Sequence, residues 1–270
     1  MNTLLQTAIQ ASLQAGKEIL SVYESDFAIE HKDDKSPLTL ADKKSHDVIV
    51  GFLKPFGIPV LSEEGATVPY EQRSKWNKLW VVDPLDGTKE FIKRNGEFTV
   101  NIALIEHQHP IMGIIYVPIT RTLYFASKAI GSYRIVVSAE LENKIAENKI
   151  SLQALIEQSV KLPKQELKSK YIVVGSRSHM SPETTAFIDD LKTSKGEIEM
   201  VSAGSSLKLC MIAEGKADIY PRFAPTMEWD TAAGQAILES IHFKLIDATS
   251  KQALQYNKEN LVNPWFIAMQ

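Results

Sequence analysis

The sequence predicts a mixed α+β and α/β protein in two halves, residues 1–138 and residues 139–270. Apolar residues recur at helical spacing near the N-terminus, and segments rich in β-branched and aromatic residues follow them. After residue 171, predicted strands and helices alternate, which is typical of a sheet with helices on its faces. We therefore expect an antiparallel sheet in the first half and a mixed sheet in the second.

The first half begins with two predicted amphipathic helices. The first spans residues 3–24, and the second begins at Thr39 or Leu40 and ends at Leu53, after a polar loop at residues 31–37. A short strand ends at Ser62, and the apolar run at residues 79–82 predicts another. The following strands are predicted to form an antiparallel meander under the two helices: residues 98–105, 111–117, 122–126 and 131–137.

Residues 138–170 are rich in Lys, Glu, Gln and Asn, which predicts a solvated connector with one or two peripheral helices. Beyond the connector, helices are expected from Ser181, over residues 205–214 and from Asp230. The intervening strands are predicted at residues 171–175, 197–201, 217–220 and 243–246.

Composition is ordinary for an enzyme, at 44% hydrophobic and 23% charged residues. The net charge of −3 gives no reason to expect nucleic-acid binding. The single cysteine, Cys210, rules out an intrachain disulfide, suits a reducing cytosol and is expected in a helix core. The N-terminus lacks the pattern of a signal peptide, and no transmembrane segment is expected.

The chemistry is concentrated in the run from Asp83 to Thr88, Asp-Pro-Leu-Asp-Gly-Thr, which directly follows an apolar segment. Proline and glycine favour a sharp bend there, so we expect the strand to end where the two carboxylates appear. The residues after Gly87 suggest a helix start, whose free N–H groups attract phosphate. A plain β-turn is the alternative interpretation.

Two further acidic segments favour a metal site over a turn. Glu63 follows a second apolar run, and Asp230 lies in the segment Trp-Asp-Thr-Ala-Ala-Gly. Hard divalent cations take oxygen ligands, so Glu63, Asp83, Asp86 and Asp230 would suffice for two or three Mg²⁺ ions. Asp230 also precedes a helical pattern and would be read as an N-cap in most proteins.

These segments, in this order, resemble the inositol monophosphatase superfamily of lithium-sensitive magnesium phosphatases. Within it the chain looks most like the bacterial 3′(2′),5′-bisphosphate nucleotidases, on the basis of the segments at residues 88–99, 175–179, 204–208 and 220–223. The resemblance covers nearly the whole chain and is weakest in the connector. It implies the layered α-β-α-β-α sugar-phosphatase fold, with the active site where the two halves meet.

The resemblance assigns the metal ligands to Glu63, Asp83, the carbonyl of Leu85, Asp86 and Asp230. In the mechanism that we expect, Asp83 bridges two ions. Glu63 and Leu85 belong to the ion that activates water, and Asp86 and Asp230 belong to the ion beside the leaving oxygen.

Several of these groups are also expected to contact the substrate. The family pattern assigns phosphate binding to Asp86, Gly87 and Thr88, and the ligands Glu63, Leu85 and Asp230 face the same phosphate.

Water orientation is assigned to the hydroxyl of Thr88, which the family pairs with Asp42. Asp42 also completes a near capping box with Thr39, so it would satisfy helix-end N–H groups in the alternative interpretation; the two roles are compatible.

Substrate selectivity is expected in the second half. Ser205 and Lys208 open a helix with hydroxyls, N–H groups and one cation, which suits a second phosphate; a surface N-cap is the alternative. By resemblance, His179 and Arg222 contact phosphate or ribose, although such side chains are often simply solvated. His107 and His109 are expected in a hairpin turn rather than at a metal site.

The resemblance implies hydrolysis of adenosine 3′,5′-bisphosphate (PAP) to AMP and phosphate, with PAPS as a further substrate in sulfate assimilation. The alternatives are an inositol or other sugar phosphatase with the same metals, and a phosphate-sensing protein that keeps the fold without turnover. Inhibition by Li⁺ and Ca²⁺ is expected from the family. The expected partner is the small-molecule nucleotide substrate. The expected location is the cytoplasm, with peripheral attachment to the inner membrane as an open alternative.

Overall fold

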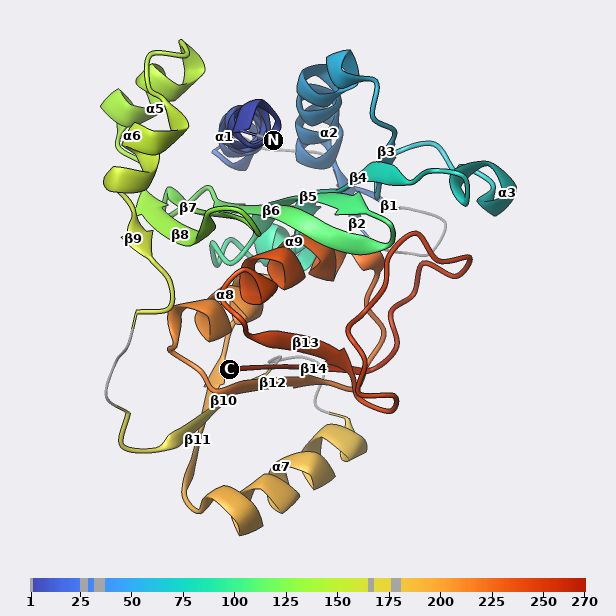
Figure 1. The fold of residues 1–270 in the computed structure, drawn as a ribbon, viewed down its shortest axis with the longest axis vertical. Helices are drawn as coiled ribbons and strands as arrows, with labels where there is room; N and C mark the ends of the chain where they lie inside the picture. Colours follow the sequence, from blue (N-terminus) through green and yellow to red (C-terminus); the bar gives the residue numbers. More distant parts are fainter. Residues whose placement is uncertain (1, 25–28, 32–36, 165–167, 176–180) are drawn as a thin grey trace.

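The computed structural model describes residues 2–24, 29–31, 37–164, 168–175 and 181–270. In this part of the chain the elements are stacked in layers (Figure 1). Helices α1 (Asn2–Tyr23) and α2 (Leu40–Leu53) lie on a seven-stranded sheet, helices α8 (Leu207–Glu214) and α9 (Glu228–Glu239) lie beneath it, and a five-stranded sheet and α7 (Pro182–Lys195) follow. The predicted α-β-α-β-α arrangement is confirmed.

The two N-terminal helices form where helical spacing predicted them. Their apolar faces bury Leu5, Ile9, Ile19, Ile49 and Leu53 against the outer face of the first sheet. Since burial of each such side chain contributes about 1.5–3 kcal/mol, this packing stabilises the outer layer.

The first sheet has the strand order β3-β4-β5-β6-β7-β8-β9. It is antiparallel from β4 to β9, as predicted for the meander, whereas the edge strand β3 is parallel to β4. Its strands are β3 (Val60–Ser62), β4 (Lys78–Asp86), β5 (Thr99–Glu106), β6 (His109–Val117), β7 (Thr122–Ser127), β8 (Gly131–Val136) and β9 (Val160–Lys161).

The connector is more closely packed than its polar composition suggested. It contains two short helices, α5 (Ala139–Ala146) and α6 (Leu152–Glu157), whose N-caps Ser138 and Ser151 accept helix N–H groups. Leu141, Ile145, Leu152 and Leu155 are buried in the same core as α1. The chain then returns to the sheet as β9, which the sequence did not predict.

The second sheet has the order β11-β10-β12-β14-β13 and is mixed, as predicted. β10 is parallel to β11 and β12, and β14 pairs antiparallel with β12 and β13. Its strands are β10 (Tyr171–Gly175), β11 (Ile198–Ser202), β12 (Ile219–Arg222), β13 (Lys244–Asp247) and β14 (Phe266–Met269), and only β14 was missed by the sequence analysis.

Helix α9 packs directly against the inner face of the first sheet. A Cβ atom at Gly113 in β6 would lie 2.3 Å from the carbonyl oxygen of Ala233, so glycine permits this close approach. On its other side, Gly234 leaves room for Leu209 of α8. One core therefore joins both sheets through the middle layer.

Short elements complete the described chain: β1 (Ile29–His31), β2 (Pro37–Thr39), the 3₁₀ helix Lys54–Phe56, α3 (Tyr70–Arg73) and α4 (Thr88–Ile92). Among the described residues, no helix combines the length and apolar character that crossing a membrane requires.

Candidate active site

β4 ends at Asp86, the second of the two carboxylates that the sequence places at the strand end. Asp83 pairs with Asn101 of β5, and Asp86 pairs with Thr99, with a register shift between them. Three steps along β4 thus match two along β5, which is the extra residue of a β-bulge. In a regular strand, side chains three positions apart point to opposite faces; the bulge lets both aspartates point to one side.

A third carboxylate joins them from α9. Oxygen atoms of Asp83, Asp86 and Asp230 all lie within 4.8 Å of one another. The structure thus brings together residues from opposite halves of the chain, as the metal-site hypothesis required.

Asp230 is the third residue of α9, which begins at Glu228, so the N-cap interpretation is wrong in position. Its Oδ2 accepts the N–H of Met227, the N-cap residue of α9, at 2.8 Å. Asp230 therefore satisfies a free helix-end donor and also contributes to the acidic cluster.

Asp86 is held by groups from both halves. Its Oδ2 accepts the backbone N–H of Ser206 at 2.6 Å and lies 3.3 Å from the side-chain nitrogen of Asn101. Behind them, the Ser206 hydroxyl lies 2.8 Å from the Asn101 side-chain oxygen and 2.8 Å from the hydroxyl of Thr99. Thr99 and Asn101 were not predicted as site residues; their polar character within an apolar strand was the available signal.

The three aspartates are costly to ionise together. Burial raises the pKa of Asp83 well above its usual range, and the charges of Glu63, Asp86, Asp230 and Asp42 raise it further. Burial also raises the pKa of Asp86 to about 6, against the opposing effect of Lys208. For Asp230, burial and then Asp86 raise the pKa to about 8. Buried carboxylates that repel one another fit a divalent cation, because the ion supplies the missing positive charge.

Glu63 lies beside this cluster rather than within it. It directly follows β3, and its N–H donates to the carbonyl of Val82 in the neighbouring strand at 3.2 Å. Its side chain is half-buried, and its charge raises the pKa of Asp83, Asp86 and Asp230. The parallel pairing of β3 with β4 therefore places Glu63 close enough for an electrostatic role in the site.

The end of β4 leads into α4 through Gly87, whose φ of 96° favours glycine. Thr88 is the first residue of α4, as predicted, and its hydroxyl lies 3.5 Å from the carbonyl oxygen of Leu85. Asp42 is buried in the first turn of α2, and its charge acts on Asp83. The side chain of Thr39, on which the capping-box alternative for Asp42 depends, lies outside the described residues.

A cavity of about 290 Å³ opens beside Asp86 and Asp230. Residues of both halves line it, among them Glu90, Glu97, Ser205, Lys208 and Arg222. Its walls therefore belong to α4, the segment between α4 and β5, the start of α8 with the residues before it, and β12, next to the acidic cluster.

Cationic and polar groups in this cavity suit an anion. Lys208 is buried, which lowers its pKa to about 8, and its Nζ donates to the carbonyl of Ser205 at 2.6 Å. The Ser205 hydroxyl and Arg222 Nε are buried without a hydrogen-bond partner among the described residues. Buried polar atoms are normally paired, so these two donors are available to a ligand in the cavity.

A family model described as "Inositol monophosphatase family" matches residues 1–265. The chain belongs to this family. A 3′(2′),5′-bisphosphate nucleotidase CysQ from Salmonella typhimurium is 40% identical over 267 residues, which is 97% of this chain and 98% of that protein. The relationship classifies the chain as an enzyme, a phosphatase.

Solved structures agree with this assignment. The crystal structure of CysQ from Bacteroides thetaiotaomicron has a TM-score of 0.89 and 48% identity, and the match covers all of this chain and 97% of that one. The extragenic suppressor protein suhB from Bartonella henselae, at 21% identity and a TM-score of 0.71, covers 99% of this chain and 94% of that one and shares the fold.

The remaining candidate residues lie outside the acidic cluster or outside the described residues. His179 lies outside the described residues. His107 is in the β5–β6 turn and His109 begins β6, and neither belongs to the acidic cluster. Cys210 is buried in α8, as expected.

Proposed function

We propose that the enzyme is a magnesium-dependent 3′(2′),5′-bisphosphate nucleotidase that hydrolyses PAP to AMP and phosphate. The observation that carries this proposal is the anion cavity next to the three aspartates, because a bisphosphate needs one phosphate site for hydrolysis and another for recognition. The activity for which the CysQ relatives are named supports the same substrate class.

In this proposal Asp83, Asp86 and Asp230 hold the Mg²⁺ ions together with Glu63 and the carbonyl of Leu85. When bound, two such ions neutralise phosphoryl charge and lower the pKa of water to generate the nucleophile. The mutual repulsion of the aspartates favours binding, since the ions relieve it.

The other residues orient the reactants. Thr88 contributes a hydroxyl and, with Gly87, helix-start N–H groups for the phosphate that is cleaved. Asp42 is the proposed acceptor for the proton of the water that Thr88 orients. Its burial and its effect on Asp83 support a position near the site.

Recognition of the second phosphate is assigned to the cavity. Lys208 provides a cation, while the unpaired Ser205 hydroxyl and Arg222 Nε provide donors. Charge-assisted hydrogen bonds to phosphate are roughly twice as strong as neutral ones. His179, by resemblance, belongs to the same substrate-binding set.

We further propose that PAPS is a second substrate, that the enzyme serves sulfate assimilation in the cytoplasm, and that Li⁺ and Ca²⁺ inhibit it. The buried thiol of Cys210 and the modest net charge are compatible with the cytoplasm.

A substrate panel tests the proposal. Phosphate release is measured from PAP, PAPS, inositol 1-phosphate and 3′-AMP, with Mg²⁺ and with EDTA. We expect PAP to have the highest kcat/KM, only with Mg²⁺, and Li⁺ to inhibit. A preference of orders of magnitude for inositol 1-phosphate would replace the nucleotidase by the sugar-phosphatase alternative. If Asp83→Asn left phosphate release unchanged, the metal assignment would be wrong.

A further inference from the structure

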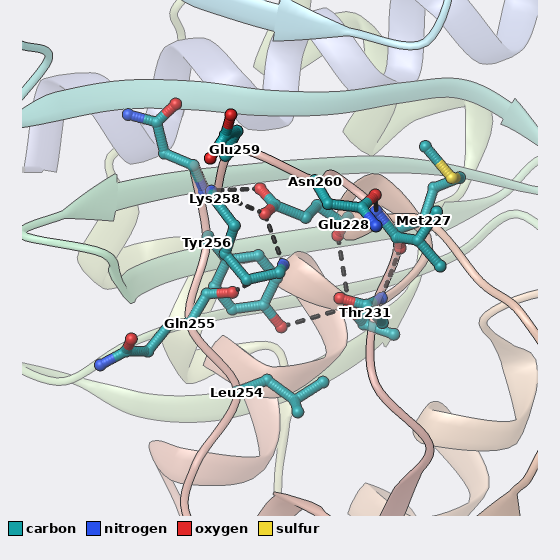
Figure 2. Close-up of polar contacts among 12 residues, drawn as sticks. Met227, Glu228, Thr231, Leu254, Gln255, Tyr256, Lys258, Glu259 and Asn260 are labelled. Carbon is teal, nitrogen blue, oxygen red and sulfur yellow. Dashed lines mark hydrogen bonds and ion pairs between the residues drawn. The ribbon is translucent and has the colours of Figure 1, made fainter. Parts of the chain in front are cut away.

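Residues 257–263, here called the C-terminal strap, wrap around the first turn of α9. The carboxylate of Glu228, the first residue of α9, is completely buried. It accepts the N–H groups of Asn257 at 2.6 Å and Lys258 at 3.0 Å, and it pairs with Lys258 Nζ at 2.5 Å. Figure 2 shows the side chains of Glu228 and Lys258 facing each other between the helix and the strap.

The far end of the strap holds the backbone beside Asp230. Leu261 accepts the N–H of Glu228 at 3.0 Å, and Val262 forms a β-bridge with Met227. The side-chain nitrogen of Asn263 donates to the carbonyl of Met227 at 2.6 Å. Met227 is the residue whose N–H binds Asp230, so the strap fixes the donor that orients this carboxylate.

The strap is anchored in turn by Arg73, the last residue of α3. Arg73 is 3% exposed, and its guanidinium donates to the side-chain oxygen of Asn257 at 3.1 Å, to the carbonyl of Lys258, and to the carbonyl of Glu259 at 2.7 Å. Asn257 returns a bond to the Arg73 carbonyl at 2.7 Å. A planar guanidinium is suited to bind several acceptors in fixed geometry.

We propose that Arg73 is a positioning residue for the metal site. It acts through Asn257, the strap and Met227 to hold Asp230 in the geometry that binds Mg²⁺. This inference rests on the proposed metal site. The same contacts join the chain that follows Glu63 to the helix that carries Asp230, so they fix the position of these two proposed ligands relative to each other.

The chemistry of metal sites supports a functional rather than merely stabilising role. Groups that hold the ligands of a metal affect its affinity, and their loss typically costs 10–100-fold. Among the described residues, Arg73 has no hydrogen bond or ion pair with the acidic cluster. Its path to Asp230 runs through hydrogen bonds to the strap and from the strap to Met227.

The test compares Mg²⁺ affinity among matched variants. MgCl₂ is titrated calorimetrically into EDTA-treated and dialysed full-length protein. Arg73→Met removes the guanidinium while keeping much of its volume. Asn257→Gly is the second variant, because its φ of 62° suits glycine and its backbone N–H to Glu228 remains. The control is Arg121→Met, which removes an arginine that binds the carbonyl of Val137 and Glu142 far from the strap.

We expect Arg73→Met to weaken Mg²⁺ binding about tenfold and Asn257→Gly to weaken it several-fold, with Arg121→Met unchanged. The KM for PAP at saturating Mg²⁺ is expected to stay close to that of the wild type. If Arg73→Met does not fold, Asn257→Gly decides. Unchanged Mg²⁺ affinity in the folded variants, or an equal loss in Arg121→Met, overturns the proposal.

The outcome is separable from that of the proposed function. A wild type that binds Mg²⁺ but releases no phosphate from nucleotides would refute the nucleotidase while leaving the strap comparison intact. A wild type that binds no Mg²⁺ would overturn the positioning role itself.

Discussion

Replacing Asp230 by asparagine is expected to stabilise the metal-free protein above neutral pH while abolishing its response to Mg²⁺. The amide oxygen of asparagine can still accept the N–H of Met227, which Asp230 binds at 2.8 Å. The substitution therefore removes a charge with little change in shape or helix-end bonding.

The pH dependence follows from the raised pKa of Asp230, which is about 8 instead of 3.8. Below pH 3.8 the group is protonated in both the folded and the unfolded chain. Between pH 3.8 and 8 the folded chain retains a proton that the unfolded chain has lost, so stability falls as pH rises. At 1.36 kcal/mol per pH unit, the full shift lowers the free energy of unfolding by roughly 6 kcal/mol. Because the neighbouring aspartates share this cost, we expect about 3 kcal/mol from Asp230 at pH 8.

The assay is thermal unfolding in EDTA at pH 5.5 and pH 8, repeated with Mg²⁺. At pH 8 the melting temperature of Asp230→Asn should exceed that of the wild type by about 6–12 °C, and the gap should shrink at pH 5.5. Mg²⁺ at a hundred times its Kd should stabilise the wild type by about 2.7 kcal/mol and leave the variant unchanged.

Asp218→Asn is the control, because Asp218 accepts the N–H of Ile172 at 2.6 Å and pairs with Lys168. Its loss should destabilise the protein at pH 8. The reasoning is refuted if Asp230→Asn is less stable than the wild type in EDTA at pH 8, or if both proteins respond equally to Mg²⁺.

Three further predictions concern the cavity and its support. Lys208→Met should raise the KM for PAP about 10–100-fold, as expected for loss of a charged hydrogen bond. In the wild type, the KM for PAP should rise as the pH rises above about 8, because the buried Lys208 then loses its proton. Asn101→Leu should weaken Mg²⁺ binding about tenfold in calorimetry, because it frees Asp86 on one side; an unchanged Kd would contradict this role. Gly204→Ala should lower kcat/KM and the melting temperature, because a Cβ there would lie 2.8 Å from the carbonyl oxygen of Glu97; wild-type values would show that the cavity wall yields.

The layered fold was largely predictable because its elements have clear periodicity. The apolar spacing of α1 and the alternation after Tyr171 depend on local sequence alone. Strands β9 and β14 were missed for different reasons. β9 has two exposed residues in a polar connector, and its existence depends on pairing with β8. β14 follows a long loop near the C-terminus and inserts between β12 and β13, an order set by tertiary pairing.

The site was predictable as a set of residue types but not as a geometry. Asp83, Asp86 and Asp230 were named from motifs, and the structure brings their oxygen atoms together. The bulge could not be foreseen, because it depends on pairing with Asn101 and Thr99. Nor could the bond from Ser206 to Asp86, since the two residues are separated by 120 positions.

The position of α9 between the sheets also has a consequence for the order in which the protein is made. Synthesis proceeds from the N-terminus, and the strands that form the first sheet leave the ribosome long before residues 228–239 do. Until then, the inner face that carries Leu79, Val81, Ala103 and Ile105 has no helix to cover it. Such a nascent sheet would expose apolar surface and be prone to aggregate. Arrival of α9 would bury that face and deliver Asp230 in the same step, so a chain that has not completed its core has no complete acidic cluster.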